Sequence, residues 1–358
     1  MIRSWIKTEA ARVLCRTGID QLVGSMSGAR RTPLVIGYHR VVEDFRSSAQ
    51  TSIPSLLVSR SMLERHLDWI GRRYRFVDLN ELGILLESGR VIEEPVAAVT
   101  FDDGYQDFYD HALPTLEKKG VPAALFVVTG LVGSRGAQIH DKLYLLLARR
   151  RGSTPVTAGI PLPDIAGMTP YRATRTLIEA VPLAALRQAI RVMESEDPIP
   201  EHKFSHSVTW EMLDRIRRAG IVIGSHTQTH IVMTNETREC VLDELVGSRQ
   251  ELERRLGTAV HHFAYPSGIY NSASVSAVAA AGYRFGFTTC AHRNAEHPLL
   301  TVPRTLLWEN SCLDSNRDFS ESIMSCQVHR VFDFMAGCRQ HHVTPTATLT
   351  QGYGNAAI

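Results

Sequence analysis

The chain has 358 residues, of which 44% are hydrophobic and 21% charged, a composition typical of a folded protein with one large core. Its formal net charge of +2 provides no strongly basic field, which argues against a nucleic-acid-binding protein. The six cysteines include no Cys-x-x-Cys pair, so zinc knuckles and dithiol redox motifs are excluded and reduced thiols are expected. No run reaches the ~20 apolar residues of a membrane span, and no apolar secretory core follows the N-terminus. We therefore expect a cytoplasmic protein.

Residues 1–31 are predicted to form an amphipathic helix, because apolar and basic residues alternate at roughly helical spacing. The apolar set is Ile2, Trp5, Ile6, Ala10, Val13 and Leu14, and the basic set is Arg3, Lys7, Arg12 and Arg16. Two interpretations remain open at this point. The helix either packs on the main domain or rests on an anionic membrane surface as a peripheral contact.

Residues 32–310 alternate short apolar runs with helical patterns, which is typical of a parallel α/β architecture. Strands are predicted at 34–38, 96–101, 123–128, 221–223, 262–265, 284–289 and 302–307. Helices are predicted at 59–74, from Asp78 to Gly89, up to Lys119, and at 210–219, 236–256 and 272–281. The proline-rich stretch 131–205 interrupts this rhythm around two helical segments, so we interpret it as an insertion that forms a rim or lid. Residues 311–358 form an extension whose small, polar end, 341–358, is expected to be disordered.

Two adjacent carboxylates, Asp102 and Asp103, follow the predicted strand 96–101 and precede Gly104. Neighbouring residues leaving a strand point in different directions, so one carboxylate can bind a metal while the other serves as a base toward water. Parallel sheets present their reactive groups at this end of the strands. Alone, the Asp-Asp-Gly sequence is equally typical of a turn.

A second motif, His226-Thr227-Gln228-Thr229-His230, follows the predicted strand 221–223. The four-residue spacing would place both imidazoles on one side of a helical turn, within reach of one ion. An isolated pair of this kind is also often structural. Together with one aspartate it makes a three-ligand set that leaves positions open for water and substrate, as catalytic metal sites do.

A third segment, from Phe263 to Gly268, again lies where a predicted strand ends. Pro266 and Gly268 indicate an irregular turn whose backbone N–H groups, that of Ser267 among them, could bind a developing oxyanion. By itself the segment is an ordinary turn.

In this order the three segments resemble the polysaccharide deacetylases, carbohydrate esterase family 4, and in particular the branch with a Phe-x-Tyr-Pro-x-Gly third motif. The resemblance covers roughly residues 33–308 without the insertion. It implies an α/β fold, a distorted (β/α) barrel with about seven parallel strands. It also implies a metal-dependent hydrolase that removes N-acetyl groups from amino sugars, with Asp102 as the base and Asp103, His226 and His230 as metal ligands.

The sequence departs from the family pattern in two places. Ala264 stands where many members have an arginine that supports the base, and Trp308 stands where they have a late histidine that supplies the general acid. His39, at the end of the strand 34–38, is a replacement acid, because related enzymes that look rearranged use a histidine from a Tyr-His segment near their start. The alternative for His39 is a structural histidine. Arg304, on the last predicted strand, is a candidate for orienting Asp102.

The predicted cofactor is one divalent metal ion, Zn²⁺ first, with Co²⁺, Ni²⁺ and Fe²⁺ compatible with the same ligands. The predicted partner is an acetylated glycan substrate, and the oligomeric state is left open. Two other hypotheses stay open: a deformylase or deacylase on a lipid-linked sugar, and a catalytically impaired glycan-binding protein. The first hypothesis uses the same site residues and is compatible with the basic N-terminal helix. The second follows from the missing arginine and histidine.

Overall fold

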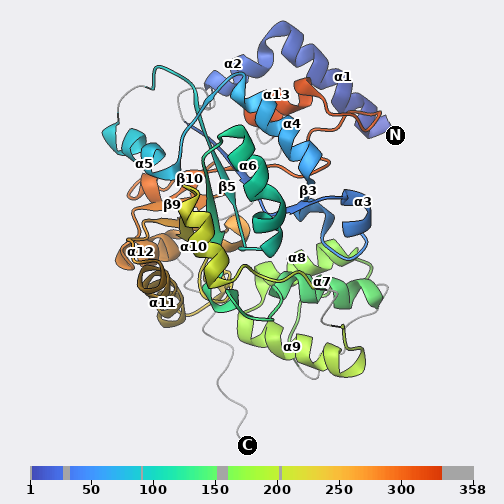
Figure 1. Ribbon diagram of the computed structural model, residues 1–358. Helices are drawn as coiled ribbons and strands as arrows, with labels where there is room; N and C mark the ends of the chain where they lie inside the picture. The colour runs from blue at the N-terminus through green and yellow to red at the C-terminus, as the bar shows by residue number, and fades with distance from the viewer. Residues whose placement is uncertain (1, 27–32, 90–91, 151–159, 201–203, 333–358) are drawn as a thin grey trace, which may run out of the picture.

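A computed structural model describes residues 2–26, 33–89, 92–150, 160–200 and 204–332. A parallel sheet curls into a barrel with helices around its outside (Figure 1). The strands are β1 Leu34–Tyr38, β2 Arg40–Val42, β3 Leu57–Ser59, β4 Arg75–Phe76, β5 Val96–Phe101, β6 Ala123–Val127, β7 Val222–Ser225, β8 His262–Ala264, β9 Phe285–Thr288, β10 Val302–Pro303 and β11 Thr305–Leu306. Eight of them follow the hydrogen-bonded order β10-β9-β8-β7-β6-β5-β1-β11, and β4 adds to β5.

Residues 302–306 form one extended segment that contains both end strands of this order, β10 and β11. Val302 pairs in parallel with Phe287 of β9, and Leu306 pairs in parallel with Gly37 of β1. Between the two pairings the backbone N–H of Arg304 donates to the Thr288 carbonyl at 2.7 Å. The segment therefore joins the two edges of the sheet, and the predicted barrel of about seven parallel strands is confirmed with its last strand split in two.

The helices fall into three groups along the chain. Those around the barrel are α3 Phe45–Ser48, α4 Arg60–Gly71, α5 Leu79–Ser88, α6 Leu113–Lys119, α10 Trp210–Arg218, α11 Arg238–Leu256 and α12 Ser272–Ala280. The inserted ones are α7 Ile139–Arg149, α8 Pro170–Ala180 and α9 Leu183–Glu196. The terminal ones are α1 Ile2–Thr17, α2 Ile19–Met26 and α13 Glu321–Val328. Figure 1 shows the inserted helices grouped on the side of the barrel away from α1 and α13.

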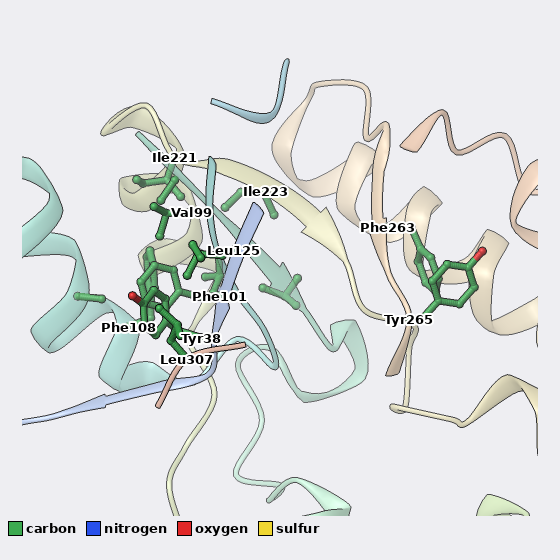
Figure 2. Close-up of a cluster of buried hydrophobic side chains, with 14 of the residues drawn as sticks. Tyr38, Val99, Phe101, Phe108, Leu125, Ile221, Ile223, Phe263, Tyr265 and Leu307 are labelled. Atoms are coloured by element: carbon green, nitrogen blue, oxygen red, sulfur yellow. The ribbon is translucent and has the colours of Figure 1, made fainter. Parts of the chain in front are cut away.

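Alternate residues of the strands belong to two different cores, as the two-residue period of a strand requires. Val99 and Phe101 of β5 join a large cluster shared with the surrounding helices, which includes Leu67 of α4. Ala98 joins a smaller cluster of strand residues together with Phe126 and α5 side chains. Figure 2 shows the Tyr38, Phe101 and Phe108 rings of the large cluster packed together. Thr100 and Asp102 follow Ala98 in steps of two residues, so their side chains point to the same side of the strand, toward the barrel interior.

Several element boundaries differ from the sequence-based expectation. The N-terminal helix is two helices, because Gly18 adopts φ +72° between them. The insertion holds three helices instead of two, since α7 begins inside a stretch that we interpreted as rim. The short strands β2, β3 and β4 and the helix α13 were not expected, because each is too short to show a clear period.

The two ends of the described chain meet. The Asp20 carboxylate of α2 accepts hydrogen bonds from Ser325 Oγ of α13 at 2.6 Å and from His329 Nδ1 at 3.2 Å. Ala11 of α1 is buried in a small cluster with Ile323 of α13. One face of the N-terminal helix pair thus packs on α13, which belongs to the C-terminal extension. The predicted disorder at 341–358 lies outside the described residues.

Of the helices in the described ranges, none is both long and apolar enough to cross a bilayer. The cysteines in the same ranges, Cys15, Cys240, Cys290, Cys312 and Cys326, are free thiols. Cys338 lies outside them.

Candidate active site

The carboxyl ends of the parallel strands open into a pocket of about 420 Å³. All seven residues singled out from the sequence lie on its wall, namely His39, Asp102, Asp103, His226, His230, Ser267 and Arg304. The strand register explains part of this convergence. Tyr38 of β1 is the register partner of Phe101 of β5, so the residues that follow, His39 and Asp102, leave neighbouring strands at the same level.

Asp102 is held by Arg304 in a buried, two-pronged ion pair. Nη1 and Nη2 of Arg304 donate to Oδ1 and Oδ2 of Asp102, each at 2.7 Å, and both residues are at most 3% exposed. Nη1 also donates to Thr100 Oγ1 at 3.1 Å. Burial alone would raise the pKa of Asp102, but the Arg304 guanidinium, with His226, brings that pKa below its ordinary value. The base candidate is therefore an oriented carboxylate with lone pairs left for water.

Arg304 supplies the guanidinium that Ala264 of the third segment cannot supply. It comes from the junction of β10 and β11. Split-strand geometry turns its side chain inward, where the guanidinium lies 5.5 Å from the Phe126 ring centre. The sequence departure at Ala264 is thus matched by a different residue that bonds Asp102.

Asp103, His226 and His230 form a buried cluster whose candidate ligand atoms all lie within 4.8 Å of one another. Oδ1 of Asp103 is 3.5 Å from His226 Nε2 and 3.3 Å from His230 Nε2. Asp103 is 1% exposed, yet no hydrogen-bond donor is assigned to either of its oxygens within the described structure. A buried carboxylate without donors is costly unless a cation compensates it. The donor set, one carboxylate and two imidazoles, fits a divalent ion such as zinc.

The protonation of His226 suits it to the role of a ligand. Its Nδ1 lies 2.8 Å from the Ala264 carbonyl, which can only accept, so Nδ1 carries the proton and Nε2 keeps its lone pair toward Asp103. Burial lowers the pKa of His226 to about 4. The imidazole is therefore neutral near pH 7, as metal binding requires.

Residues 226–230 form a turn and not the helical turn that the four-residue spacing suggested. Thr227 and His230 have φ of +65° and +61°, and the His230 N–H donates to Thr227 Oγ1 at 2.9 Å. The buried Glu244 carboxylate of α11 accepts from the N–H groups of Gln228 and Thr229 at 2.8 and 2.9 Å. These contacts hold a backbone conformation that side-chain-bearing residues rarely adopt.

The third segment contributes a strained turn at the pocket wall. Ser267 is exposed and has φ +57°. Gly268 follows with φ +68°, and a Cβ there would collide with the Thr289 side chain, so only glycine fits this position. Its carbonyl accepts a hydrogen bond from Thr288 Oγ1 at 2.6 Å. The tight packing of Gly268 against Thr289 and the hydrogen bond from Thr288 therefore both restrain this turn.

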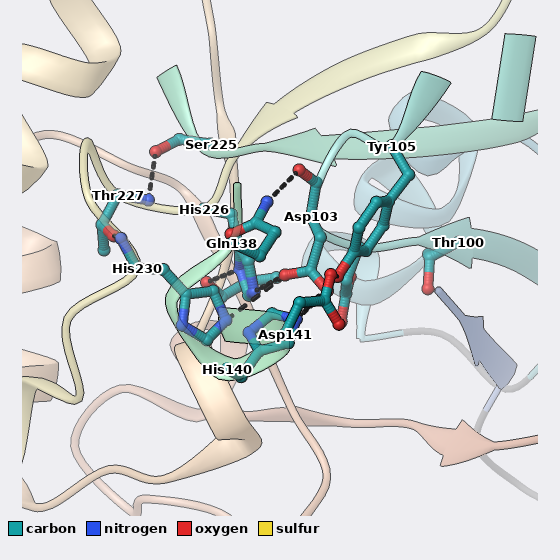
Figure 3. Close-up of polar contacts among 12 residues, drawn as sticks. Thr100, Asp103, Tyr105, Gln138, His140, Asp141, Ser225, His226, Thr227 and His230 are labelled. Carbon is teal, nitrogen blue, oxygen red and sulfur yellow. Dashed lines mark hydrogen bonds and ion pairs between the residues drawn. The ribbon is translucent and has the colours of Figure 1, made fainter. Parts of the chain in front are cut away.

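Sequence reasoning missed a set of residues at the start of α7. His140 lines the pocket with its Nε2 3.7 Å from Asp103 Oδ2, and its ring centre is 5.0 Å from that of His230. Gln138 donates to the Asp103 carbonyl at 2.8 Å (Figure 3). A signal was present in the polar Gln138-Ile139-His140-Asp141 run ahead of an apolar helix, but the run lies inside the insertion. The insertion therefore reaches the site in addition to forming a rim.

Comparisons with known proteins agree with this geometry. The family model of the polysaccharide deacetylases matches residues 90–286, more than half of the chain. The Bacillus subtilis protein YxkH, named as a candidate polysaccharide deacetylase, is 22% identical over 236 residues, which is 66% of this chain and 60% of that protein. A poly-β-1,6-N-acetyl-D-glucosamine N-deacetylase of Staphylococcus epidermidis is 30% identical over 113 residues, or 29% of this chain and 39% of the relative. The chain thus spans less than two thirds of the length of both relatives.

Solved structures share the fold. IcaB from Ammonifex degensii superposes with a TM-score of 0.53 at 18% identity, covering 84% of this chain and 97% of that one. The Streptococcus pyogenes deacetylase PplD, solved with acetate, superposes with a TM-score of 0.51 at 19% identity, covering 78% and 93%. At such low identity this likeness establishes the barrel architecture alone.

Proposed function

This chain belongs to the polysaccharide deacetylase family, and from that premise we propose that it removes N-acetyl groups from the amino sugars of a poly- or oligosaccharide. The observation that carries the proposal is the pairing of two adjacent carboxylates in different surroundings. Asp102 is bound by a guanidinium, whereas Asp103 lies against two imidazoles. This division provides a base and a metal ligand side by side. We assign the chain to the branch with the Phe-x-Tyr-Pro-x-Gly third motif, and place its catalytic unit in residues 32–310.

Asp103, His226 and His230 would hold one divalent ion, with Zn²⁺ as the first candidate and Co²⁺, Ni²⁺ or Fe²⁺ compatible with the same donors. A divalent ion bound there supplies Lewis acidity toward the acyl carbonyl and lowers the pKa of water. Asp102 accepts the proton of the attacking water, and Arg304 keeps the carboxylate in one orientation. Arg304 also stabilises the anionic form of Asp102, which makes it available at neutral pH.

Two further residues would act on the reacting amide, one on its carbonyl oxygen and one on its nitrogen. The exposed Ser267 stands at the pocket wall in a fixed turn, where its backbone N–H would stabilise the oxyanion. His39 leaves β1 beside Asp102 and lines the same pocket. It would give a proton to the departing amine, because an amine anion is a very poor leaving group.

The substrate is an acetylated amino-sugar polymer. Relatives named poly-β-1,6-N-acetyl-D-glucosamine N-deacetylases support this class. The oriented Asp102–Arg304 pair argues against the impaired glycan-binding alternative, because a site without turnover has no use for a supported base. A deacylase or deformylase on a lipid-linked sugar remains the second candidate, favoured by the exposed apolar side chains of α1 and α2 described below.

The deciding experiment incubates the zinc-loaded protein with acetylated oligosaccharides of defined linkage and measures released acetate and formate together with the product masses. We expect acetate and a free amino sugar. Formate from a lipid-linked substrate would favour the second candidate. No turnover on any substrate, with Asp102→Asn as the inactive reference, would contradict both.

The N-terminal helices support peripheral contact with an anionic bilayer. Among the described residues, five of the seven exposed large apolar side chains lie on α1 and α2, namely Trp5, Ile6, Val13, Ile19 and Leu22. Arg12 and Arg16 are exposed on the same helices. An apolar face that carries cations is typical of helices lying in a membrane interface. Cytoplasmic residence stays a prediction.

A vesicle sedimentation assay tests this contact. The protein should sediment with phosphatidylserine-containing vesicles and less with neutral ones. Trp5→Ser with Val13→Ser should reduce the bound fraction, whereas Ile84→Ser, an exposed apolar position away from α1 and α2, should leave it unchanged. Equal sedimentation of all variants would contradict the assignment.

A further inference from the structure

The beginning of α7 contacts Asp103 at two separate points. The Gln138 side chain, which directly precedes the helix, donates from Nε2 to the Asp103 carbonyl oxygen at 2.8 Å. His140, in the first turn, places Nε2 3.7 Å from the Asp103 carboxylate oxygen Oδ2. Figure 3 shows the Gln138 amide reaching the Asp103 carbonyl and the His140 ring near the Asp103 carboxylate. Gln138 and His140 are 1% and 7% exposed, so these are buried contacts within the site.

Asp103 needs such support because its conformation is unfavourable on its own. Its φ is +71°, a left-handed conformation that residues with a side chain rarely adopt. The next residue, Gly104, is also left-handed with φ +69°. A carbonyl bonded by a buried amide restrains this backbone, and therefore restrains the direction in which the carboxylate leaves it.

The hydrogen bonds of Tyr105 determine where His140 carries its proton. The Tyr105 hydroxyl lies 2.7 Å from Asp141 Oδ2 and 2.7 Å from His140 Nε2. A carboxylate only accepts, so the single hydroxyl proton goes to Asp141, and the hydroxyl oxygen must accept from His140. His140 is thus an Nε2–H tautomer that donates to Tyr105, and Nε2 lies 3.7 Å from Oδ2 of Asp103, close enough for electrostatic attraction but beyond hydrogen-bond distance.

We propose that Gln138 and His140 are positioning residues of the metal site, which act through Asp103 and are themselves aligned by Tyr105 and Asp141. The proposal rests on the proposed function, since it concerns the same ligand cluster. Oδ2 faces His140 Nε2 at 3.7 Å, and Oδ1 is the oxygen that lies 3.5 and 3.3 Å from His226 and His230. His140 is not one of the clustered ligand atoms, and its effect on the ion is therefore indirect.

Residues that support a metal ligand from outside the ligand set typically contribute roughly 10- to 100-fold to metal affinity. A residue that only anchors the insertion to the barrel would change the free energy of unfolding and leave the affinity of the folded protein unchanged. These two roles are separable by measuring zinc binding on protein that is shown to be folded.

The experiment measures the zinc dissociation constant of the full chain by competition with a chromophoric chelator, together with the thermal midpoint by circular dichroism. We expect His140→Ala to weaken zinc binding by roughly 10- to 100-fold and His140→Gln, which keeps an N–H donor, to lose less. Tyr105→Phe and Gln138→Met should each weaken binding severalfold. Lys142→Ala, on the same helix in an ion pair with Glu194, is the matched control and should bind as the wild type does.

This inference is overturned if folded His140→Ala binds zinc within twofold of the wild-type affinity while Asp103→Ala does not bind it. That result would leave the proposed function intact. A wild-type chain that binds no divalent ion would overturn both. If His140→Ala does not fold, Tyr105→Phe and Gln138→Met decide the matter, and unchanged affinity in both overturns the proposal.

Discussion

The barrel strands and the inserted helices α7 and α8 both line the pocket, but they contribute different kinds of side chain. The strand ends supply the groups to which we assign the reaction, Asp102 as base and Asp103 as metal ligand, with Arg304 bonded to Asp102. The insertion supplies buried support through Gln138 and His140 and, from α8, a wall that includes Tyr171. Under the proposed function, the reaction belongs to the barrel, and the insertion would tune the ligand cluster and the fit of the substrate.

Removing a barrel ligand should have the largest effect. Asp103→Ala deletes the carboxylate that lies against both imidazoles, so we expect loss of stoichiometric zinc and of all turnover. Elemental analysis of the purified variant measures this directly, with Lys142→Ala as the matched control. Full zinc content in Asp103→Ala, and equally in His226→Ala and His230→Ala, would show that the ion binds elsewhere.

Asp102→Asn should keep the ion and lose activity, because the amide retains the shape of the carboxylate but cannot accept the proton of water. We expect turnover to fall by roughly 10² to 10⁴. The substitution also leaves Arg304 buried without its counter-charge, which destabilises such pairs by about 3–5 kcal/mol. Activity must therefore be compared at a temperature where thermal melts show both proteins folded. Near-normal turnover would assign the base role to another group.

His39→Ala should lower hydrolysis of an amide substrate by ~10² or more, as expected for removal of a general acid. An activated aryl acetate should be affected much less, because its leaving group departs without a proton. Steady-state rates on the two substrates give the comparison. Equal losses on both would indicate a structural role for His39, and no loss on either would return the search for the acid to other residues.

Changes on the inserted wall should have the smallest effect and a different character. Tyr171 of α8 is 40% exposed and lines the pocket, so Tyr171→Ala should alter the ratio of kcat/KM between long and short oligosaccharides severalfold. Zinc content should remain that of the wild type. Ile84→Ala, remote from the pocket, is the control. An unchanged ratio of kcat/KM values would indicate that α8 has a packing role and does not contact the substrate.

The strand-end chemistry could be predicted because it follows from simple patterns. Val96–Phe101 is a near-continuous apolar run that ends at Asp102, and the observed β5 has the predicted bounds. β1 likewise has the predicted bounds, 34–38. The carboxyl ends of parallel strands must converge, so the meeting of Asp103 with His226 and His230 followed without knowledge of the turns between them.

The supporting contacts could not be predicted in the same way. His140 meets Asp103 across 37 positions of chain through a helix whose placement depends on the packing of the insertion. Glu244 holds the turn at 228–229 from the middle of α11, where a glutamate ordinarily faces solvent. The split of residues 302–306 into β10 and β11 leaves no mark in the apolar pattern. Arg304 was therefore foreseen as a candidate for orienting Asp102, but without the geometry that turns it inward.

The joining of both sheet edges by residues 302–306 has a consequence for the order of events during folding. The contact between Arg304 and Asp102 spans 202 positions, and contacts of such separation form late because a long loop must close first. A growing chain that has not yet added residues 302–306 holds Asp102 on a sheet with two open edges and without its guanidinium. The base becomes oriented in the same step that closes the barrel, so catalytic competence should appear during refolding together with the slowest structural phase.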